Sequence, residues 1–216
     1  EKAVHLVQGG FAKAIVTPPL HKEALKAAGI EHIGYTEILS ALTNTKKAVT
    51  MFDTLGLKIF FHTRHLSLRQ ALDAVTKESL LETIKTCDKI TKSSPAFDQS
   101  LSLAVAGLNP HCGEHGLFGD EERVSIEPAI QEARKLGIDV TGPIGADSVF
   151  YQTRMGVYRA VISLYHDQGH IAAKTYDFNR TISITWGLPF LRTSVDPGTA
   201  FDIAGKNLAD PDSMRE

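Results

Sequence analysis

The chain has 216 residues, of which 43% are hydrophobic and 22% are charged, and its formal net charge is −2. This composition is typical of a soluble globular protein with a sizeable core. The balanced charge argues against a nucleic-acid or membrane-surface protein, and no apolar run reaches the roughly 20 residues of a membrane helix. Two cysteines, Cys87 and Cys112, form no disulfide framework, so we expect a reducing, cytoplasmic location.

The hydrophobic pattern predicts strands that alternate with helices, which favours an α/β fold with a mostly parallel sheet. The predicted strands cover residues 11–16, 48–52, 57–61, 101–106, 160–165 and 181–185. The predicted helices cover residues 23–28, 37–43, 68–75, 78–90 and 121–136, and another begins at 198–204. Thr36 and Thr76 are the expected N-caps of the helices at 37–43 and 78–90.

Three predicted strands run into segments that carry two histidines each, namely His62 and His65, His111 and His115, and His166 and His170. Open α/β folds place ligand sites at the carboxyl ends of their strands, so one histidine from each segment would give a metal three nitrogen ligands and open positions for substrate. Histidines three or four residues apart bind one metal when they lie on a helix. These pairs follow strands, so their spacing carries little weight. Polar loop residues without function are the competing interpretation.

Four further residues are candidates for the chemistry. Lys174 and Arg192 would bind a carboxylate or phosphate, although a solvated surface cation explains either one alone. Asp147 and Asp167 would act as a general acid or base or orient a histidine ligand, unless they are turn or capping residues. Neither a Gly-x-Gly-x-x-Gly motif nor a phosphate-binding P-loop is present, so the sequence gives no support for an ordinary Rossmann dinucleotide site.

Five motifs, in order along nearly the whole chain, resemble those of the 4-hydroxythreonine-4-phosphate dehydrogenase family and its paralogues. They are VTPPLHK at 16–22, GLNPH at 107–111, GPIGAD at 142–147, YHDQG at 165–169 and GLPFLRTSVD at 187–196. The resemblance implies the α/β/α sandwich of the isocitrate and isopropylmalate dehydrogenases. It also implies that 1–216 is a fragment of a two-domain protein without its N- and C-terminal parts, with a substrate and dimerisation part near 20–140 and a nucleotide-binding part near 141–216.

The resemblance further implies metal- and NAD-dependent oxidation of a small 4-phosphorylated 3-hydroxy acid, with decarboxylation, by a homodimer with a shared active site. In the family's pattern, His65 of one subunit and His111 and His166 of the other hold the metal. Zinc suits three histidines best, and magnesium, manganese and cobalt are alternatives. Lys174 and Asp147 fall on catalytic positions. The substrate-binding positions are Tyr35, Thr36, Lys174, Ser183 and Arg192, and no cofactor-binding residue is assigned.

Three positions depart from the family's pattern: Tyr35 and Pro197 replace histidines and Ser183 replaces an asparagine. The positions of Tyr35 and Ser183 contact the substrate in the family's pyridoxine-biosynthesis enzyme, so their replacement predicts a paralogue with another substrate. The candidates are 4-phospho-D-threonate, 4-phospho-D-erythronate or a cis-dihydrodiol carboxylate, and His170 also resembles the paralogues. A catalytically silent metal-binding homologue is the alternative from another class of function.

Overall fold

A computed structural model describes residues 1–32 and 34–216, which form two compact units. The first unit comprises residues 1–55 and 177–216, and the second comprises residues 56–176. The sequence predicted a substrate and dimerisation part near 20–140 and a nucleotide-binding part near 141–216. These assigned roles stay a prediction. In the described residues, no helix has the length and apolar character that a membrane crossing requires.

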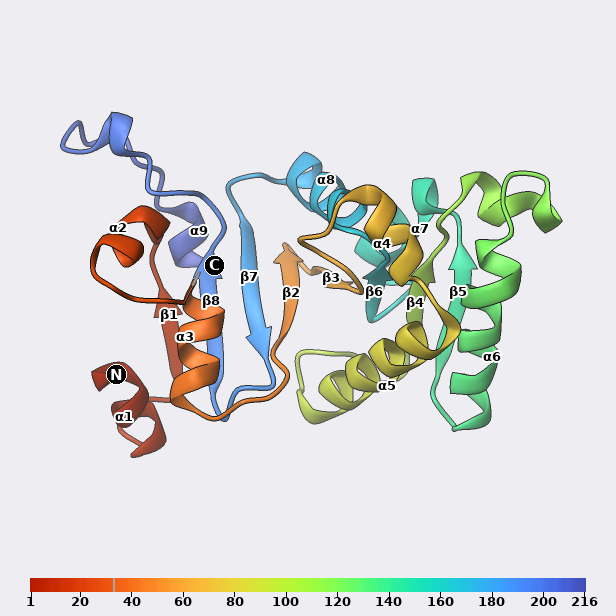
Figure 1. Ribbon diagram of the computed structural model, residues 1–216, viewed down its shortest axis with the longest axis horizontal. Coiled ribbons are helices and arrows are strands. Elements are labelled where there is room, and N and C mark those ends of the chain that lie inside the picture. The colour runs from red at the N-terminus through yellow and green to blue at the C-terminus, as the bar shows by residue number, and fades with distance from the viewer. Residues whose placement is uncertain (33) are drawn as a thin grey trace. The chain divides into compact units, whose positions relative to one another are not determined.

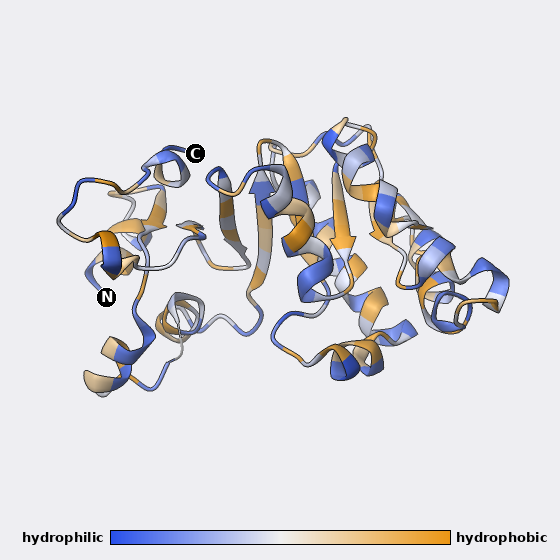
Figure 2. Ribbon diagram, turned by 90° about the horizontal axis from the view of Figure 1, so that it is seen from above, coloured by the Kyte–Doolittle hydropathy of each residue, from blue (hydrophilic) through white to orange (hydrophobic). Residues whose placement is uncertain are grey.

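The second unit is built on four parallel strands in the order β3-β6-β4-β5. The strands are β3 (Leu57–Phe61), β4 (Leu103–Ala106), β5 (Val140–Ile144) and β6 (Ala160–Ser163). Every residue of β4 and β6 is buried, because continuous apolar runs suit strands that are covered on both faces. Figure 2 shows these strands as hydrophobic ribbons between helices that also carry hydrophilic residues.

Helices cover both faces of these strands, so the second unit has three layers. They are α4 (Leu68–Ala74), α5 (Lys77–Ser93), α6 (Glu127–Lys135), α7 (Ala146–Arg154) and α8 (His166–Tyr176). Figure 1 shows α4 and α5 in front of the strands, while α7 and α8, which pack on β3 and β6, lie behind them. The predicted α/β/α arrangement is therefore confirmed.

The first unit has the strand order β1-β8-β7-β2. Strand β1 (Ala14–Thr17) is parallel to β8 (Leu191–Val195), whereas β7 (Thr181–Trp186) is antiparallel to β8 and to β2 (Val49–Thr54). The helices are α1 (Lys2–Gln8), α2 (Lys22–Ala27), α3 (Tyr35–Leu42) and α9 (Asp212–Arg215). Parallel pairings thus predominate within the two units, as the sequence predicted.

Some predicted boundaries are wrong. Thr36 does not cap α3, because the N-cap is Gly34 and Thr36 lies inside the first turn. Thr76, in contrast, caps α5 through a reciprocal bond with Ser79. The helix predicted at 121–136 begins with a π-helical turn, Glu122–Ile126, and the one expected at 198–204 is a short 3-10 turn, Phe201–Ile203.

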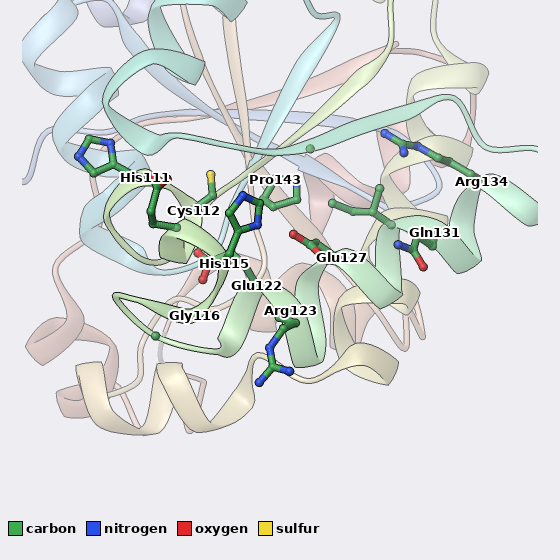
Figure 3. A pocket seen from close by; sticks show the side chains of 14 residues that line it. His111, Cys112, His115, Gly116, Glu122, Arg123, Glu127, Gln131, Arg134 and Pro143 are labelled. Carbon is green, nitrogen blue, oxygen red and sulfur yellow. The ribbon is translucent and has the colours of Figure 1, made fainter.

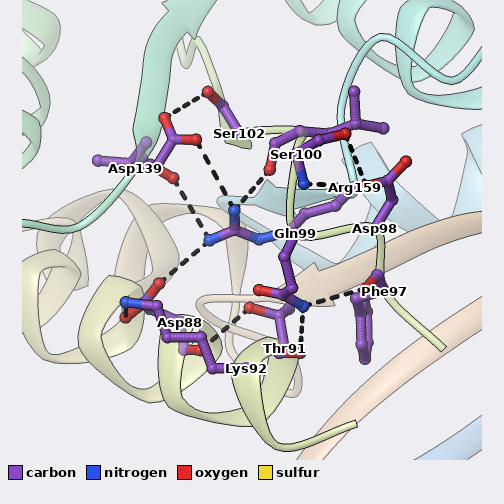
Figure 4. A network of polar contacts seen from close by, with 12 residues as sticks. Asp88, Thr91, Lys92, Phe97, Asp98, Gln99, Ser100, Ser102, Asp139 and Arg159 are labelled. Atoms are coloured by element: carbon purple, nitrogen blue, oxygen red, sulfur yellow. Dashed lines mark hydrogen bonds and ion pairs between the residues drawn. The ribbon is translucent and has the colours of Figure 1, made fainter. Parts of the chain in front are cut away.

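A buried ion pair joins α5 to the strands of the second unit (Figure 4). Arg159 lies just before β6, and its side chain is 2% exposed. Its Nη2 donates to Asp88 Oδ1 at 3.1 Å, and its Nη1 donates to the Leu101 carbonyl oxygen at 2.5 Å. Lys92 Nζ donates to the other Asp88 oxygen at 2.7 Å. The two buried charges therefore compensate each other, which a region of low dielectric requires.

We expect Asp88→Ala to lower the free energy of unfolding by about 3 kcal/mol, because it leaves the buried Arg159 guanidinium only the longer pair with Asp139 Oδ2 at 4.0 Å. Urea denaturation, followed by circular dichroism, measures the change. The matched control is Glu132→Ala, which removes an exposed pair with Lys135 at 3.3 Å. Its expected loss is below about 1 kcal/mol. Equal losses in the two variants would contradict the role given to the buried pair.

Candidate functional site

The three histidine segments follow neighbouring parallel strands of the second unit. Because β6 lies between β3 and β4, the carboxyl ends of these strands meet at one edge. His65 lies between β3 and α4, His111 lies in the turn after β4, and His166 is the first residue of α8 after β6. The structure thus places all three predicted metal ligands along the edge where this fold class binds ligands.

Two of these histidines lie close to each other within one chain. The ring centroids of His65 and His166 are 6.0 Å apart. His166 Nδ1–H donates to Asp167 Oδ1 at 2.6 Å, so the lone pair of this imidazole is on Nε2. A carboxylate on the far nitrogen of an imidazole is a common companion of a metal-ligating histidine. Of the roles considered for Asp167, the geometry supports orientation of His166.

The expectation of a loop at His-Asp-Gln-Gly is wrong, because β6 ends at Ser163 and α8 begins at His166. His166 and His170 therefore lie four residues apart on a helix, and their rings stack with centroids 3.6 Å apart and planes at 12°. His170 Nδ1–H donates to the His166 carbonyl oxygen at 2.8 Å, and its ring contacts Phe61 at 4.6 Å between centroids. The stack of Phe61, His170 and His166 restricts the orientation of the His166 ring.

Two residues of the YHDQG motif, to which the sequence assigned no role, position the start of α8. Gln168 Oε1 accepts from Leu164 N, and Gln168 Nε2 donates to the Gly107 carbonyl oxygen, each at 2.8 Å. The amide thereby ties the ends of β6 and β4 together. A Cβ atom on Gly169 would lie 2.5 Å from Phe61 Cε1, so the absence of a side chain lets α8 approach β3.

His111 opens a turn with left-handed backbone. Residues 111–115 have φ angles of 52°, 53°, 78°, 41° and 56°. Non-glycine residues pay roughly 1–2 kcal/mol each for this conformation, so other contacts must hold the turn. The turn borders a cavity of about 460 Å³. Figure 3 shows His115 near Glu127 at this cavity, while the His111 ring projects away from Glu127 and Gln131.

The three predicted ligands do not form one cluster. Across residues 1–32 and 34–216, no set of three or more histidine, cysteine, aspartate or glutamate side chains is arranged to hold a metal ion. His65 and His166 approach each other, and His111 does not complete the set within one chain. The donor chemistry still suits zinc, because an imidazole oriented by a carboxylate is an ordinary zinc ligand.

Asp147 and Lys174, the candidate catalytic residues, also lie in the second unit. Asp147 is exposed in the first turn of α7, and Lys174 is half-buried in the last turn of α8. Asp147 and Asp167 line a broad cavity of about 840 Å³ between these helices. The cavity therefore connects the candidate proton-transfer residue to the start of α8.

The first unit contains a buried arginine, Arg192 on β8, which is 5% exposed. Its Nε and Nη2 donate to Thr17 Oγ1 at 3.1 and 2.6 Å, and its Nη1 donates to Thr185 Oγ1 at 3.0 Å. Thr17 and Thr185 come from β1 and β7, the strands that flank β8. The ring of Tyr35 lies 5.6 Å from Arg192 Cζ. Strand pairing thus fixes this guanidinium from both sides.

The contacts of Arg192 leave its charge without a carboxylate. In the part of the chain that the structure describes, no acidic side chain forms an ion pair with it. Burial lowers the pKa of Arg192 from its usual value, and Tyr35 and Glu37 act in the opposite direction. A buried cation that is bonded only to hydroxyl groups favours binding of an anion.

The other substrate-binding candidates also lie in the first unit. Thr36 is half-buried on α3 beside Tyr35, and Ser183 is half-buried on β7 opposite Ser194. Pro197 lines a separate cavity of about 740 Å³, and most of the residues that line this cavity come from the segment at 195–214. Two of the three positions that depart from the family's pattern therefore lie near Arg192 or on its neighbouring strand, and the third borders a cavity.

The whole chain, residues 1–216, matches the family model described as pyridoxal phosphate biosynthetic protein PdxA. The chain belongs to the PdxA family. A relative from Fusobacterium nucleatum, named provisionally as a D-threonate 4-phosphate dehydrogenase, is 57% identical over 100% of this chain and 64% of its own length. The resemblance seen in the motifs is thus confirmed, and the chain spans a little under two thirds of the length of such PdxA relatives.

Solved structures show the same relationship. A 4-hydroxythreonine-4-phosphate dehydrogenase from Klebsiella pneumoniae has a TM-score of 0.87 at 43% identity, over 99% of this chain and 64% of its own. A terephthalate 1,2-cis-dihydrodiol dehydrogenase from Burkholderia xenovorans has a TM-score of 0.70 at 27% identity, over 99% and 67%. A β-decarboxylating dehydrogenase from Thermococcus kodakarensis, with a TM-score of 0.51 at 13% identity over 93% and 62%, shares the fold.

Cys112 provides a test of the electrostatics around the His111 turn. Burial raises the pKa of its thiol, and the carboxylates of Glu122, Asp147 and Glu127 act in the same direction. Because the thiolate is the reactive form, we expect the alkylation rate by iodoacetamide to reach its midpoint at a higher pH than for a cysteine in a short peptide. A Cys87→Ser background leaves Cys112 as the single thiol. A midpoint at or below that of the peptide would contradict the expected environment.

Proposed function

We propose that the protein containing this chain is a metal- and NAD-dependent dehydrogenase of a small 4-phosphorylated 3-hydroxy acid, with D-threonate 4-phosphate as the first candidate. The observation that carries the proposal is Arg192, a buried guanidinium that is held by two threonine hydroxyls and has no carboxylate partner in the described residues. This arrangement suits the phosphate or carboxylate of the substrate. The identity to the Fusobacterium nucleatum relative supports the choice of substrate.

In this proposal the histidines hold the metal and the remaining candidates bind substrate or move protons. His65, His111 and His166 supply imidazole nitrogens, and Asp167 keeps His166 Nε2 directed toward the ligand position. A bound divalent metal, with zinc as the first choice, would stabilise the alkoxide as hydride leaves for NAD, and the enolate if carbon dioxide is then lost. Lys174 and Asp147 transfer the hydroxyl proton, and Tyr35, Thr36 and Ser183 contact the substrate around Arg192.

The proposal includes a homodimer in which the metal ligands come from two subunits. A site divided in this way needs no three-residue cluster within one chain, in agreement with the arrangement of the described residues. The distance of 6.0 Å between the rings of His65 and His166 leaves a second arrangement open, in which both ligands come from the same subunit. Complementation between variants distinguishes the two arrangements.

We expect Arg192→Met to raise KM for D-threonate 4-phosphate by about 10- to 100-fold, because the loss of charge-assisted hydrogen bonds costs roughly 1.5–3 kcal/mol. NAD reduction by the full-length protein, measured on a panel of 4-phosphorylated hydroxy acids and cis-diol acids, gives KM and kcat. The matched control is Arg180→Met, which removes a half-exposed guanidinium of the same unit. Similar KM values for wild type and Arg192→Met would contradict the anion site.

The same panel separates the alternatives. Turnover of a cis-diol acid without competition from inorganic phosphate would favour a cis-dihydrodiol carboxylate dehydrogenase, in line with the likeness to the Burkholderia xenovorans structure. Bound metal without turnover of any panel member would favour a catalytically silent homologue.

We expect His65→Ala, His111→Ala and His166→Ala each to lose bound zinc and activity in the full-length protein. If the site is shared, mixing His65→Ala and His166→Ala subunits restores about a quarter of the wild-type activity. Random pairing makes half of the dimers mixed, and each mixed dimer has one intact site out of two. His115→Ala, in the same turn as His111, is the matched control and retains its zinc. Unchanged zinc content in His111→Ala or His166→Ala would contradict the ligand assignment, and absence of recovery on mixing would contradict the shared site.

A further inference from the structure

Glu122 is a buried carboxylate that none of the proposed chemical roles includes. It lies at the start of the π-helical turn before α6, and it is 2% exposed. A buried glutamate needs hydrogen bonds that replace its hydration. Within the described residues no lysine or arginine forms an ion pair with it, so its contacts identify what it stabilises.

In the described part of the chain, every hydrogen bond to the Glu122 carboxylate comes from the segment that leads from β4 to His111. Glu122 Oε1 accepts from the backbone nitrogens of Leu108 and Asn109, each at 2.7 Å. Glu122 Oε2 accepts from Asn109 Nδ2 at 2.8 Å, and the same amide donates to Glu121 Oε2 at 2.7 Å. The carboxylate therefore fixes both the backbone and the side chain of Asn109, two residues before His111.

The next residues of the segment are packed around the same carboxylate. Asn109 O accepts from Cys112 N at 3.1 Å, which closes the first part of the left-handed turn. A Cβ atom on Gly113 would lie 3.1 Å from Glu122 Oε2 and 2.8 Å from the Gly119 carbonyl oxygen. Gly113, in the middle of the left-handed residues, therefore lies against the Glu122 carboxylate. Local preference opposes this backbone, so the buried charge supplies a compensating interaction.

We propose that Glu122 is the positioning residue for His111: it holds the segment at 107–116 in the left-handed conformation that presents the imidazole at the edge shared by β3, β6 and β4. This proposal rests on the proposed function for the role of His111 as a metal ligand. The conformational part stands on the hydrogen bonds alone.

The test uses Glu122→Gln in the full-length protein. The substitution keeps the shape of the side chain but replaces Oε2, which accepts from Asn109 Nδ2, with an NH2 group. Two hydrogen-bond donors then face each other without an acceptor. Asn109 cannot turn its amide over, because Glu121 Oε2 accepts from it at 2.7 Å. We expect faster hydrogen–deuterium exchange in the peptide covering 107–118 and a zinc Kd raised by about 10- to 100-fold, the usual effect of losing a residue that orients a ligand.

Two controls separate positioning from a general loss of stability. Ile90→Val, on α5, or Ile90→Ala where a larger loss is needed, removes part of a buried side chain on another helix and lowers Tm, and it should leave the zinc Kd unchanged. The double variant Glu121→Gln/Glu122→Gln permits the Asn109 amide to turn over, so that Asn109 Oδ1 accepts from the two introduced amide groups. We expect the double variant to bind zinc more tightly than Glu122→Gln alone, a non-additivity that a purely structural role does not produce.

Each outcome decides the proposal. A zinc Kd of Glu122→Gln equal to that of an Ile90 variant of the same Tm would overturn it. If wild-type protein binds no zinc, the proposed metal site fails, and the exchange measurement then decides the role of Glu122 separately. In that case, unchanged exchange in the peptide covering 107–118 would show that Glu122 does not hold the turn.

Discussion

The pairing of β6 with both β3 and β4 is the constraint on which the second unit depends. These strands are parallel, so each connection that leaves a carboxyl end delivers its first residues to the same edge. His65, His111 and His166 all lie along this edge, although the first and the last are 101 positions apart in the sequence. The burial of β4 and β6 on both faces makes this register hard to shift, because a slip would exchange large and small side chains within two close-packed layers.

Around this edge, the chain relies on side chains that bridge one strand end to the next. Gln168 links the ends of β6 and β4, and Glu122 binds the segment after β4. Asp167 orients one imidazole while His170 covers its face. In the first unit Thr17 and Thr185 do the same for Arg192 by means of hydroxyls alone. In both units, side chains without a proposed part in the reaction fix the orientation of the histidines or of Arg192.

The sequence predicts much of this and misses an identifiable part. Apolar runs that end in histidine were sufficient to predict the strands and the edge, because burial and strand direction are local signals. The helix at His166 was missed because a polar segment directly after an apolar strand is typical of a loop, whereas the close approach of Gly169 to Phe61 shows why this helix needs a glycine. Thr17, Thr185 and Glu122 gave no signal, since threonine is an ordinary strand residue and a glutamate in an amphipathic helix is normally solvated. Their hydrogen-bond partners lie between 7 and 175 residues away in the sequence.

The division of the chain has a consequence for how it forms. The second unit is one continuous segment, residues 56–176, whereas the first unit needs both ends of the chain. Strand β1 pairs with β8, so Ile15 meets Arg192 only after the intervening sequence has been made. During synthesis the second unit, which carries the histidines, can therefore complete its core first. The first unit, which carries Arg192, cannot form until residues 177–216 have been made. The order of translation would then complete the strand edge that carries the three histidines before the guanidinium of Arg192 is enclosed.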